Sequence, residues 1–410
     1  MRDLKIFTTN VEQQAIDQID LLLAQDAFKD CKIRIMPDVH AGSGCVIGFT
    51  GNLGDKVIPN IVGVDIGCGM LTINLGNVEI DLAELDNYIK ENIPSGRNIY
   101  SNDNIDEYDK YIAEYIIDQL YCKNELRNID WLKNSLGTLG GGNHFIEIDI
   151  DEENNKYLVI HTGSRNLGKQ VAEIYQDLAI KNCSFEKEIK KESKKLIEEY
   201  KAAGRQREIE QGLLNIKNKY LGLTKLPRDL CYLEGKEREA YLHDMKLCQE
   251  FAWHNRHSIG GNIIAYLVKT QKYRLKEFSD YFDTIHNYIS FEDNIVRKGA
   301  ISAKKDEIVL IPMNMRDGCI IGKGKGNEDW NYSAPHGAGR IMSRASARNN
   351  LNLEEFKETM KDIYTSTANE STIDEAPMAY KPAQEIIDNI SDTIEIIKII
   401  KPIYNFKATE

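Results

Sequence analysis

The stretch IVGVDIGCGM, residues 61–70, joins a β-branched run to a glycine-rich turn. Asp65 and Cys68 lie three residues apart in this turn. A cysteine in such a place is either a small buried side chain of the core or a thiolate ligand beside a carboxylate. The choice between the two depends on which other segments the fold brings to this turn.

Length and composition are those of a globular protein without a membrane span. The chain has 410 residues, of which 42% are hydrophobic, so it can form one large domain or two to three ordinary ones. It contains no run of about 18 apolar residues and no N-terminal apolar segment followed by a cleavage site. We therefore expect a cytoplasmic protein with no membrane partner.

The cysteines argue against a disulfide framework and against a zinc ribbon. No two of them form a CxxC pair in this long, leaderless chain. We expect most of them to be buried as small apolar side chains. They are Cys31, Cys45, Cys68, Cys122, Cys183, Cys231, Cys248 and Cys319.

The charge of the chain is unevenly distributed. The net charge is −12, which argues against a general nucleic-acid coat protein. Residues 295–348, however, contain ten Lys or Arg and only five Asp or Glu. This excess predicts a basic face on an acidic protein, which suits RNA or a nucleotide.

Strand-like segments that end in glycine-rich polar loops recur along the chain. Residues 32–77, 136–165 and 285–347 have this pattern, and we expect helices over the segments 11–28, 81–136 and 236–269. Active sites commonly form in such loops. The loops run from residue 36 to residue 340, so we expect one site assembled by a single domain of mixed α/β class over residues 1–410.

Residues 184–218 are strongly charged and favour helix. We expect a solvent-exposed helical insertion or hairpin within the domain, because mixed charges are typical of a solvated face. An arm that binds a partner is the alternative.

Four of the eight histidines lie beside Gly, Asn or the end of a strand: His144, His161, His286 and His336. Imidazole, thiolate and carboxylate together suit zinc, manganese, iron or cobalt. No local motif such as HExxH is present, so a metal site with Cys68 would have to combine distant segments. Spacing alone leaves structural histidines as the other interpretation. His254 and His257 share one helix face, and we expect them to be surface residues.

The common nucleotide-binding motifs are absent. GKGKG at 322–326 lacks the Ser or Thr of a P-loop, and GSGCVIG at 42–48 has the wrong glycine spacing for a dinucleotide loop. The chain also lacks KxDG, the lysine motif of ATP-dependent ligases. A nucleotide would therefore have to bind in another way.

In order and approximate spacing, seven segments together resemble the RtcB-type RNA ligases across nearly the whole chain. They are PDVHAGSGCVIG (37–48), VGVDIGCGM (62–70), LGGGNHFIE (139–147), HTGSRNLG (161–168), IHN (285–287), HGAGRIMSR (336–344) and DEAPMAYK (374–381). The resemblance implies one large domain in which mixed sheets surround a central metal and nucleotide cleft. It also implies an enzyme that uses GTP to join an RNA 3′-phosphate or 2′,3′-cyclic phosphate to a 5′-hydroxyl, through a histidine–GMP intermediate and an RNA–ppG end.

The resemblance also assigns roles to individual residues. His336 would be the nucleophile that becomes guanylylated, and Asp65 would assist deprotonation of the attacking hydroxyl. Two Mn²⁺ ions would be held by Asp65, Cys68, His144, His161 and His286. The GTP site would comprise Asn143, Phe145, Glu147, Asn314, Cys319, His336, Gly337, Ala338, Gly339 and Lys407. RNA phosphates would meet Arg165, Arg340 and Arg344, whose guanidinium groups suit that task.

The chain departs from the family pattern at MNMRDGC, residues 313–319. Asn314 and Cys319 stand where many members have serines near the guanine, which makes GTP preference an open question. We expect a shorter, divergent branch that repairs cleaved tRNA or rRNA instead of splicing tRNA. Whether an archease-type activator is needed is also open.

Two other functions compete with the ligase. One is a metal-dependent phosphoesterase that hydrolyses cyclic phosphate without ligation and does not need His336. The other is a non-catalytic RNA-binding module, against which the retained thiol and histidines argue.

Overall fold

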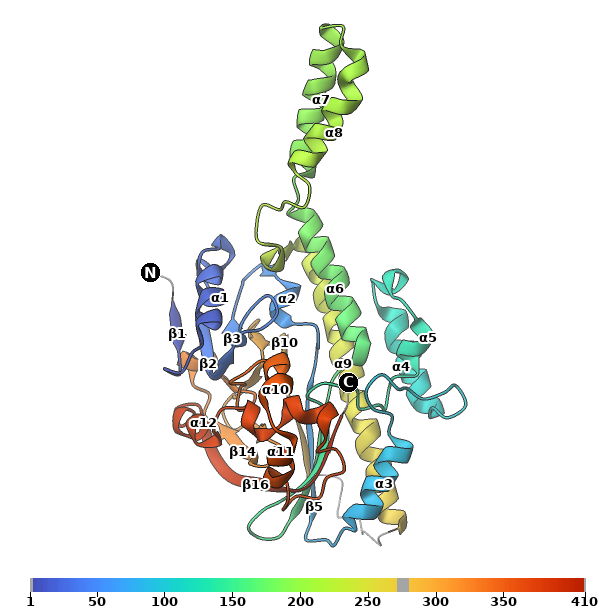
Figure 1. The fold of residues 1–410 in the computed structure, drawn as a ribbon, viewed down its shortest axis with the longest axis vertical. Helices are drawn as coiled ribbons and strands as arrows, with labels where there is room; N and C mark the ends of the chain where they lie inside the picture. Colours follow the sequence, from blue (N-terminus) through green and yellow to red (C-terminus); the bar gives the residue numbers. More distant parts are fainter. Residues whose placement is uncertain (1–2, 271–279, 409–410) are drawn as a thin grey trace.

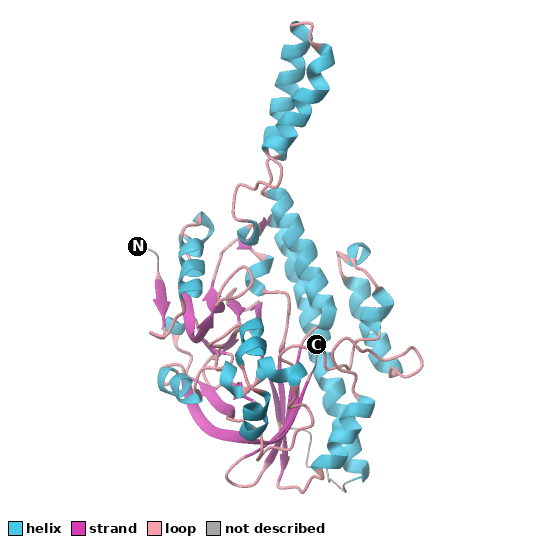
Figure 2. Cartoon of the chain, in the orientation of Figure 1, coloured by secondary structure: helices cyan, strands magenta, loops and turns pink. Residues whose placement is uncertain are grey.

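A seven-stranded antiparallel sheet carries most of the segments singled out above (Figures 1 and 2). The computed structural model describes residues 3–270 and 280–408. In spatial order the strands are β13 (Ile308–Asn314), β14 (Gly318–Gly324), β16 (Ile394–Lys407), β6 (Phe145–Ile150), β7 (Lys156–Thr162), β5 (Gly69–Gly76) and β9 (Tyr281–Ile285).

The sheet curls so that its two edge strands meet. The backbone N–H of Leu310 on β13 donates to Oγ1 of Thr284 on β9 at 3.0 Å. Strand β16 has 14 residues, and it pairs with β14 through Ile394–Ile400 and with β6 through Lys401–Lys407. One long strand therefore joins two parts of the sheet that are distant in sequence.

A second sheet of five strands adjoins the first. Its order is β1 (Leu4–Ile6), β2 (Ile33–His40), β3 (Ile47–Gly51), β11 (Val296–Lys298) and β10 (Asn287–Ile289). Two-stranded ladders pair β4 (Lys56–Val57) with β8 (Leu233–Glu234), and β12 (Ala300–Ser302) with β15 (Ser333–Pro335). A single residue, His286, separates β9 from β10, so it lies where the chain crosses from one sheet to the other.

Helices cover one side of the large sheet (Figure 2). The longest is α9, which packs Ile259 and Ile263 against Leu71 and Ile160 of the sheet. The helices are α1 (Gln13–Leu23), α2 (Pro59–Val62), α3 (Leu82–Asn92), α4 (Glu107–Gln119), α5 (Ile129–Lys133), α6 (Arg165–Asn182), α7 (Glu186–Ala202), α8 (Ile209–Lys219), α9 (Gly235–Thr270), α10 (Arg344–Asn350), α11 (Leu353–Thr359) and α12 (Ala383–Asn389). Short 3₁₀ turns are η1 (Asp26–Phe28), η2 (Lys123–Glu125), η3 (Gln206–Glu208), η4 (Arg228–Leu230), η5 (Glu328–Trp330), η6 (Glu370–Glu375) and η7 (Pro377–Ala379).

The expected mixed α/β class is confirmed, with local differences. The helix expected over 236–269 is α9, and the segment 11–28 forms α1 followed by η1. The segment 81–136 contains three helices instead of one: Pro94 and Gly96 follow α3, and the chain becomes extended at Leu120 after α4. The structure contains no membrane-spanning helix within residues 3–270 and 280–408.

The prediction of a basic face over residues 295–348 is wrong in part, because some of its cations are buried. Arg297 is fully buried, and its guanidinium donates to Oγ of Ser333 and to the carbonyl of Asn331. Lys298 is also buried and donates to the carbonyl of Asn60. Composition counts charges but does not report burial, so these cations belong to the core.

Helices α7 and α8 form an antiparallel hairpin that projects from the end of α6 (Figure 1). Gly212 of α8 is buried against Leu196 of α7, and the ring of Phe185 stacks on that of Tyr220 with centroids 5.0 Å apart. We refer to residues 184–225 as the arm. The prediction that 184–218 is an insertion in a single domain stays a prediction.

Candidate metal and nucleotide site

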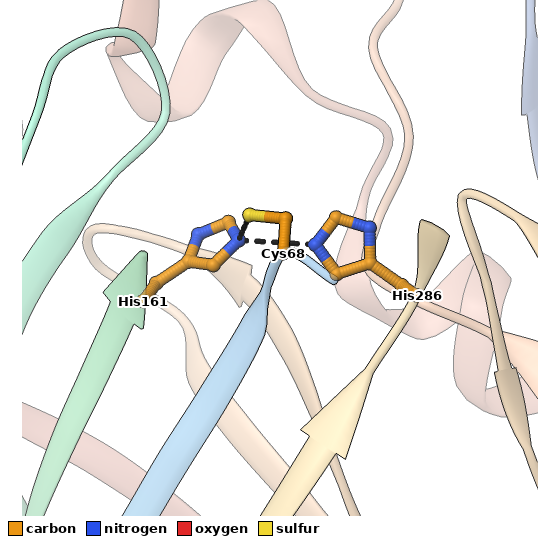
Figure 3. A group of neighbouring side chains, drawn as sticks. All are labelled: Cys68, His161 and His286. Carbon is orange, nitrogen blue, oxygen red and sulfur yellow. Dashed lines mark hydrogen bonds between the residues drawn. The ribbon is translucent and has the colours of Figure 1, made fainter. Parts of the chain in front are cut away.

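Three neighbouring strands of the large sheet bring Cys68, His161 and His286 together (Figure 3). Cys68 immediately precedes β5, His161 lies on β7, and His286 follows β9. The register pairs Met70 with His161 and Gly69 with Ile285, so the three side chains fall at one end of the sheet. The N–H of His286 donates to the carbonyl of Cys68 at 3.0 Å, which joins the end of β9 to the start of β5.

The donor atoms of these side chains form two overlapping groups. Sγ of Cys68 lies 3.3 Å from Nε2 of His161, which lies 3.1 Å from Nε2 of His286. On the other side of Cys68, Nε2 of His144 lies 3.5 Å from Sγ and 3.3 Å from Oδ2 of Asp65. Within each group the donor atoms lie within 4.8 Å of one another. Cys68 belongs to both groups, so its sulfur could contact a cation held by either of them.

Backbone carbonyls fix the tautomers of two of the histidines. Nδ1 of His144 donates to the carbonyl of Leu139 at 2.8 Å, and Nδ1 of His161 donates to that of Asn143 at 3.3 Å. A carbonyl only accepts, so the neutral rings present the lone pair of Nε2 to Cys68. Burial, and next the neighbouring histidines, hold the pKa of His161 well below its usual value. Neutral imidazole is the form that binds a metal.

The ionisation of Cys68 and Asp65 also fits a cation. Burial, and next the charge of Asp65, raise the pKa of the Cys68 thiol well above its usual value. Burial raises the pKa of Asp65 as well, but when His144 is protonated its hydrogen bond and charge outweigh burial and hold that pKa below the usual range. A thiolate beside this carboxylate therefore needs a positive ion, and the S, N and O donor set suits Zn²⁺, Mn²⁺, Fe²⁺ or Co²⁺.

His336 lies beside the donor groups, just after β15. Its ring centroid is 4.8 Å from that of His286. Oδ2 of buried Asp38 accepts from Nδ1 of His336 at 2.6 Å and from its backbone N–H at 3.2 Å. The left-handed Gly339 (φ 77°) packs its Cα on the backbone of Asp38, where a Cβ would clash. Asp38 therefore occupies Nδ1 and leaves Nε2 as the free nitrogen.

A cavity of about 320 Å³ opens beside these histidines. The predicted residues that line it are Asp65, Asn143, Phe145, Glu147, His161, His286, Asn314, His336, Gly337, Ala338, Gly339, Arg340, Arg344 and Lys407. Cys68, His144, Arg165 and Cys319 do not line it.

At one part of this cavity a lysine and a carboxylate flank an aromatic ring. Nζ of Lys407 lies 5.2 Å from the ring centroid of Phe145 and donates to the carbonyl of Asn143 at 2.8 Å. Burial raises the pKa of Glu147 to about 7, and Nδ2 of Asn405 donates to its Oε1 at 2.5 Å. The cavity thus offers a donor, an acceptor and an apolar face to a planar ligand.

The predicted arginines already have protein partners. Arg340 and Arg344 pair with the carboxylate of Glu375 at 3.1 Å and 2.5 Å. Nζ of Lys407 lies 2.9 Å from the other oxygen of Glu375. Arg165, in contrast, donates to Oγ1 of Thr138 and to the carbonyl of Gly96, outside the cavity lining.

Asn314 and Cys319, which the resemblance places in the GTP site, differ in their surroundings. The amide of Asn314 is engaged in its own turn, because its Oδ1 accepts from the N–H groups of Arg316 and Asp317. Cys319 is buried beside Asp149 and Glu147 instead of lining the cavity.

Sequence reasoning missed Asp38 and Glu375. Both lie in segments that were recognised, PDVHAGSGCVIG and DEAPMAYK. Their roles come from contacts with His336 and with Arg340, Arg344 and Lys407, which lie far away in sequence. A buried acid in an otherwise apolar or small-residue segment was the available signal.

Comparison with known proteins supplies the family. The model of the family described as "tRNA-splicing ligase RtcB" matches residues 23–408. The chain belongs to the RtcB family. RNA-splicing ligase RtcB of Escherichia coli strain K12 is 30% identical, over 99% of this chain and 97% of that protein. The tRNA-splicing ligase RtcB of Nanoarchaeum equitans is 29% identical, over 89% and 85%. An RtcB homolog of Entamoeba histolytica is 25% identical, over 92% and 80%.

Removal of the shared thiol should weaken cation binding. We expect Cys68→Ala to weaken Mn²⁺ binding at least about tenfold, since both donor groups lose a ligand. Equilibrium dialysis of Mn²⁺ against the purified protein measures this. Cys45→Ala, which removes a buried core thiol outside the donor groups, is the matched control and should bind as wild type. Unchanged Mn²⁺ affinity in Cys68→Ala would contradict the metal site.

The carboxylate of Glu375 should stabilise the fold above mildly acidic pH. Burial raises its pKa, but Lys407, Arg344 and Arg340 outweigh burial and lower it to about 2. Because an unfolded glutamate titrates near ~4.3, the stabilisation is complete above that pH and is lost as pH falls toward about 2. At neutral pH we expect Glu375→Gln to lower the free energy of unfolding by about 3 kcal/mol.

Urea unfolding at a series of pH values tests this expectation. The difference between wild type and Glu375→Gln should narrow on acidification. Glu354→Gln, which changes an exposed glutamate paired with Lys357, should leave the urea midpoint unchanged at every pH. A pH-independent difference for Glu375→Gln would show that its effect is steric.

Proposed function

We propose that the protein is an RNA ligase that uses GTP to join an RNA 3′-phosphate or 2′,3′-cyclic phosphate to a 5′-hydroxyl. The observation that carries the proposal is the setting of His336. Asp38 holds its Nδ1, and its ring lies in the cavity next to His286 and the donor groups around Cys68. Membership of the RtcB family supports RNA ligation.

In the first step Nε2 of His336 attacks the α-phosphorus of GTP. A nitrogen–phosphorus bond forms, and the bond to the departing pyrophosphate breaks. The proton on Nδ1 stays in the hydrogen bond to Asp38, whose carboxylate offsets the positive charge that develops on the ring. The product is a histidine–GMP phosphoramidate.

In the second step an oxygen of the RNA 3′-phosphate attacks the phosphorus of the bound GMP. The electron pair of the nitrogen–phosphorus bond returns to His336, and an RNA–ppG end forms. The RNA 5′-hydroxyl then attacks the 3′-phosphate, GMP leaves, and a 3′,5′-phosphodiester results. Asp65 lines the cavity, and its carboxylate can accept the hydroxyl proton. A cyclic phosphate must first be hydrolysed to the 3′-phosphate.

Two divalent cations, Mn²⁺ in our proposal, would be held by the donor groups around Cys68. Asp65 and His144 would serve one cation, His161 and His286 the other, with Cys68 between them. When bound, such cations neutralise charge on the phosphates.

The geometry supports a guanine base between Phe145, Glu147 and Lys407. Guanine presents N–H donors to a carboxylate, and its oxygen acceptor suits an ammonium group. Asn314 lines the cavity and can contact the base only if its turn rearranges, whereas Cys319 is too buried to do so. For RNA phosphate we favour Arg344, whose side chain is 34% exposed against 14% for Arg340.

We further propose that the substrate is cleaved RNA that needs repair, in line with the divergent segment 313–319. Much faster ligation of tRNA exon halves than of nicked tRNA or rRNA stem-loops would contradict this part. The same reactions run with and without an archease-type activator would show whether one is needed.

The histidine–GMP step can be tested directly. We expect wild type with Mn²⁺ and GTP labelled at the α-phosphate to acquire protein-bound label that acid removes and alkali does not. His336→Ala should acquire none, and Cys68→Ala should acquire none because its cations are lost. His254→Ala, on the outer part of α9, is the control and should be labelled as wild type.

The other outcomes are also informative. Label from a different nucleotide but not from GTP would mean that the segment 313–319 has changed base choice. No label from any nucleotide would exclude the ligase mechanism and favour the phosphoesterase, which needs the donor groups around Cys68 but not His336. RNA binding without metal or label would favour the non-catalytic module.

Asp38 should be required to orient the nucleophile. In Asp38→Asn the side chain keeps its size but loses the charge that balances the imidazolium, so we expect labelling to slow by about 10²–10⁴-fold. The urea midpoint should change little by comparison. Asp55→Asn, an exposed aspartate paired with Lys56, should label at the wild-type rate. Normal labelling of Asp38→Asn would exclude this role for Asp38.

A further inference from the structure

The arm carries a groove lined by lysines. Its volume is about 650 Å³, and Lys190, Lys194 and Lys201 of α7 line it together with Lys217 of α8. All four lysines are exposed, and none makes an ion pair within the described part of the chain. The other lining residues are Glu186, Ile189, Ser193, Ile197 and Glu198. The floor of the groove is therefore largely apolar, and four lysines against two glutamates give it an excess of positive charge. We call it the lysine groove.

Four other cations of the arm are neutralised by carboxylates, whereas Lys187, Lys191 and Arg207, which lie outside the groove, form no ion pair among the described residues. The pairs are Lys195–Glu199, Arg205–Glu208, Lys219–Glu192 and Lys225–Glu188, with N···O distances of 3.6, 2.6, 2.9 and 2.9 Å. Four glutamates of the arm thus pair with cations outside the groove. The four groove lysines stay unpaired, although Glu186 and Glu198 lie among them.

The spacing of the groove lysines suits a linear polyanion. Lys190, Lys194 and Lys201 are four and seven residues apart, so they share one face of α7. They extend over roughly 16 Å along the helix axis. Ammonium groups on flexible stems bind phosphates as point charges, without demanding a particular base.

Helix α6 connects the lysine groove to the catalytic cavity. It begins at Arg165, next to Gly163, whose Cα packs against Asp65, and it ends at Asn182, at the base of the arm. Its 18 residues correspond to roughly 27 Å. The reacting RNA ends therefore cannot reach the groove while they are in the cavity, but the body of a longer RNA can.

We propose that the lysine groove binds the phosphate backbone of the RNA substrate, away from its reacting ends. The inference rests on the proposed RNA ligase function. An acidic protein could also bind the lysines. RNA is the stronger candidate because its charge is denser and more regular, and because it is the substrate proposed for the cavity. The groove would add affinity for structured RNA without contributing to catalysis.

The test compares two quadruple variants with the same change in charge. One carries Lys190→Ala, Lys194→Ala, Lys201→Ala and Lys217→Ala. The matched control carries Lys195→Ala, Arg205→Ala, Lys219→Ala and Lys225→Ala, which removes the ion-paired cations. Binding of a tRNA-sized RNA with a 3′-phosphate is measured over a range of NaCl concentrations, together with histidine guanylylation and ligation of short single-stranded RNA ends.

We expect the groove variant to bind the long RNA at least about tenfold more weakly at ~0.1 M salt, with a salt slope shallower by about 2–4. The control should lose less than about threefold. Both variants should keep wild-type guanylylation and wild-type ligation of the short ends, since the groove lies outside the cavity.

Equal affinity of the groove variant and wild type for the long RNA would overturn the inference and leave an acidic protein as the candidate partner. Equal losses in both variants would also overturn it, because net charge would then explain the effect. Absence of guanylylation in wild type would instead overturn the proposed function, so the two failures are distinguishable.

Discussion

The buried thiol of Cys68 is shared by two groups of donor atoms, and the geometry of the site depends on this sharing. Sulfur can lie close to His144, His161 and His286 only because β6, β7, β5 and β9 are neighbours in a fixed register. A slip of one residue would turn a ligand to the other face of the sheet. The hydrogen bonds to the carbonyls of Leu139 and Asn143 then direct the imidazole lone pairs inward. The register of the strands and the tautomers of the histidines together determine the positions of the donor atoms.

A second constraint is electrostatic. The cavity is lined by cations and carboxylates that neutralise one another before any ligand arrives, with Glu375 at the centre of Arg340, Arg344 and Lys407. This arrangement keeps the cations in place in a buried setting, where an unpaired charge would be costly. A phosphate ligand would have to compete with Glu375 for these three cations. The cations are therefore held in position in advance, but a carboxylate already neutralises part of their charge.

Much of the site could be predicted from the sequence, because short motifs preserve both residue type and order. The mixed α/β class followed from strands that alternate with helices, and Cys68 could be grouped with the histidines through the family resemblance. Asp38 and Glu375 could not be assigned, since their roles arise from partners about 300 and 30 residues away and a carboxylate alone does not reveal its partner. The prediction of a basic face at 295–348 was wrong in part because Arg297 and Lys298 are buried, and composition does not show burial. In the arm, composition predicted the helices. It could not show which lysines form ion pairs, because the pairing depends on how the two helices pack.

Strand β16 has a consequence for biosynthesis. It follows every other strand in the sequence, yet it lies between β14 and β6 and carries Lys407 into the cavity. Until this strand has been synthesised, β14 and β6 have no common neighbour and the cavity lacks the ammonium group of Lys407. The strands that carry Cys68, His161 and His286 therefore precede, in the chain, the strand that completes the cavity lining. Closure of the sheet by its last strand is also a long-range event, which is slow in folding.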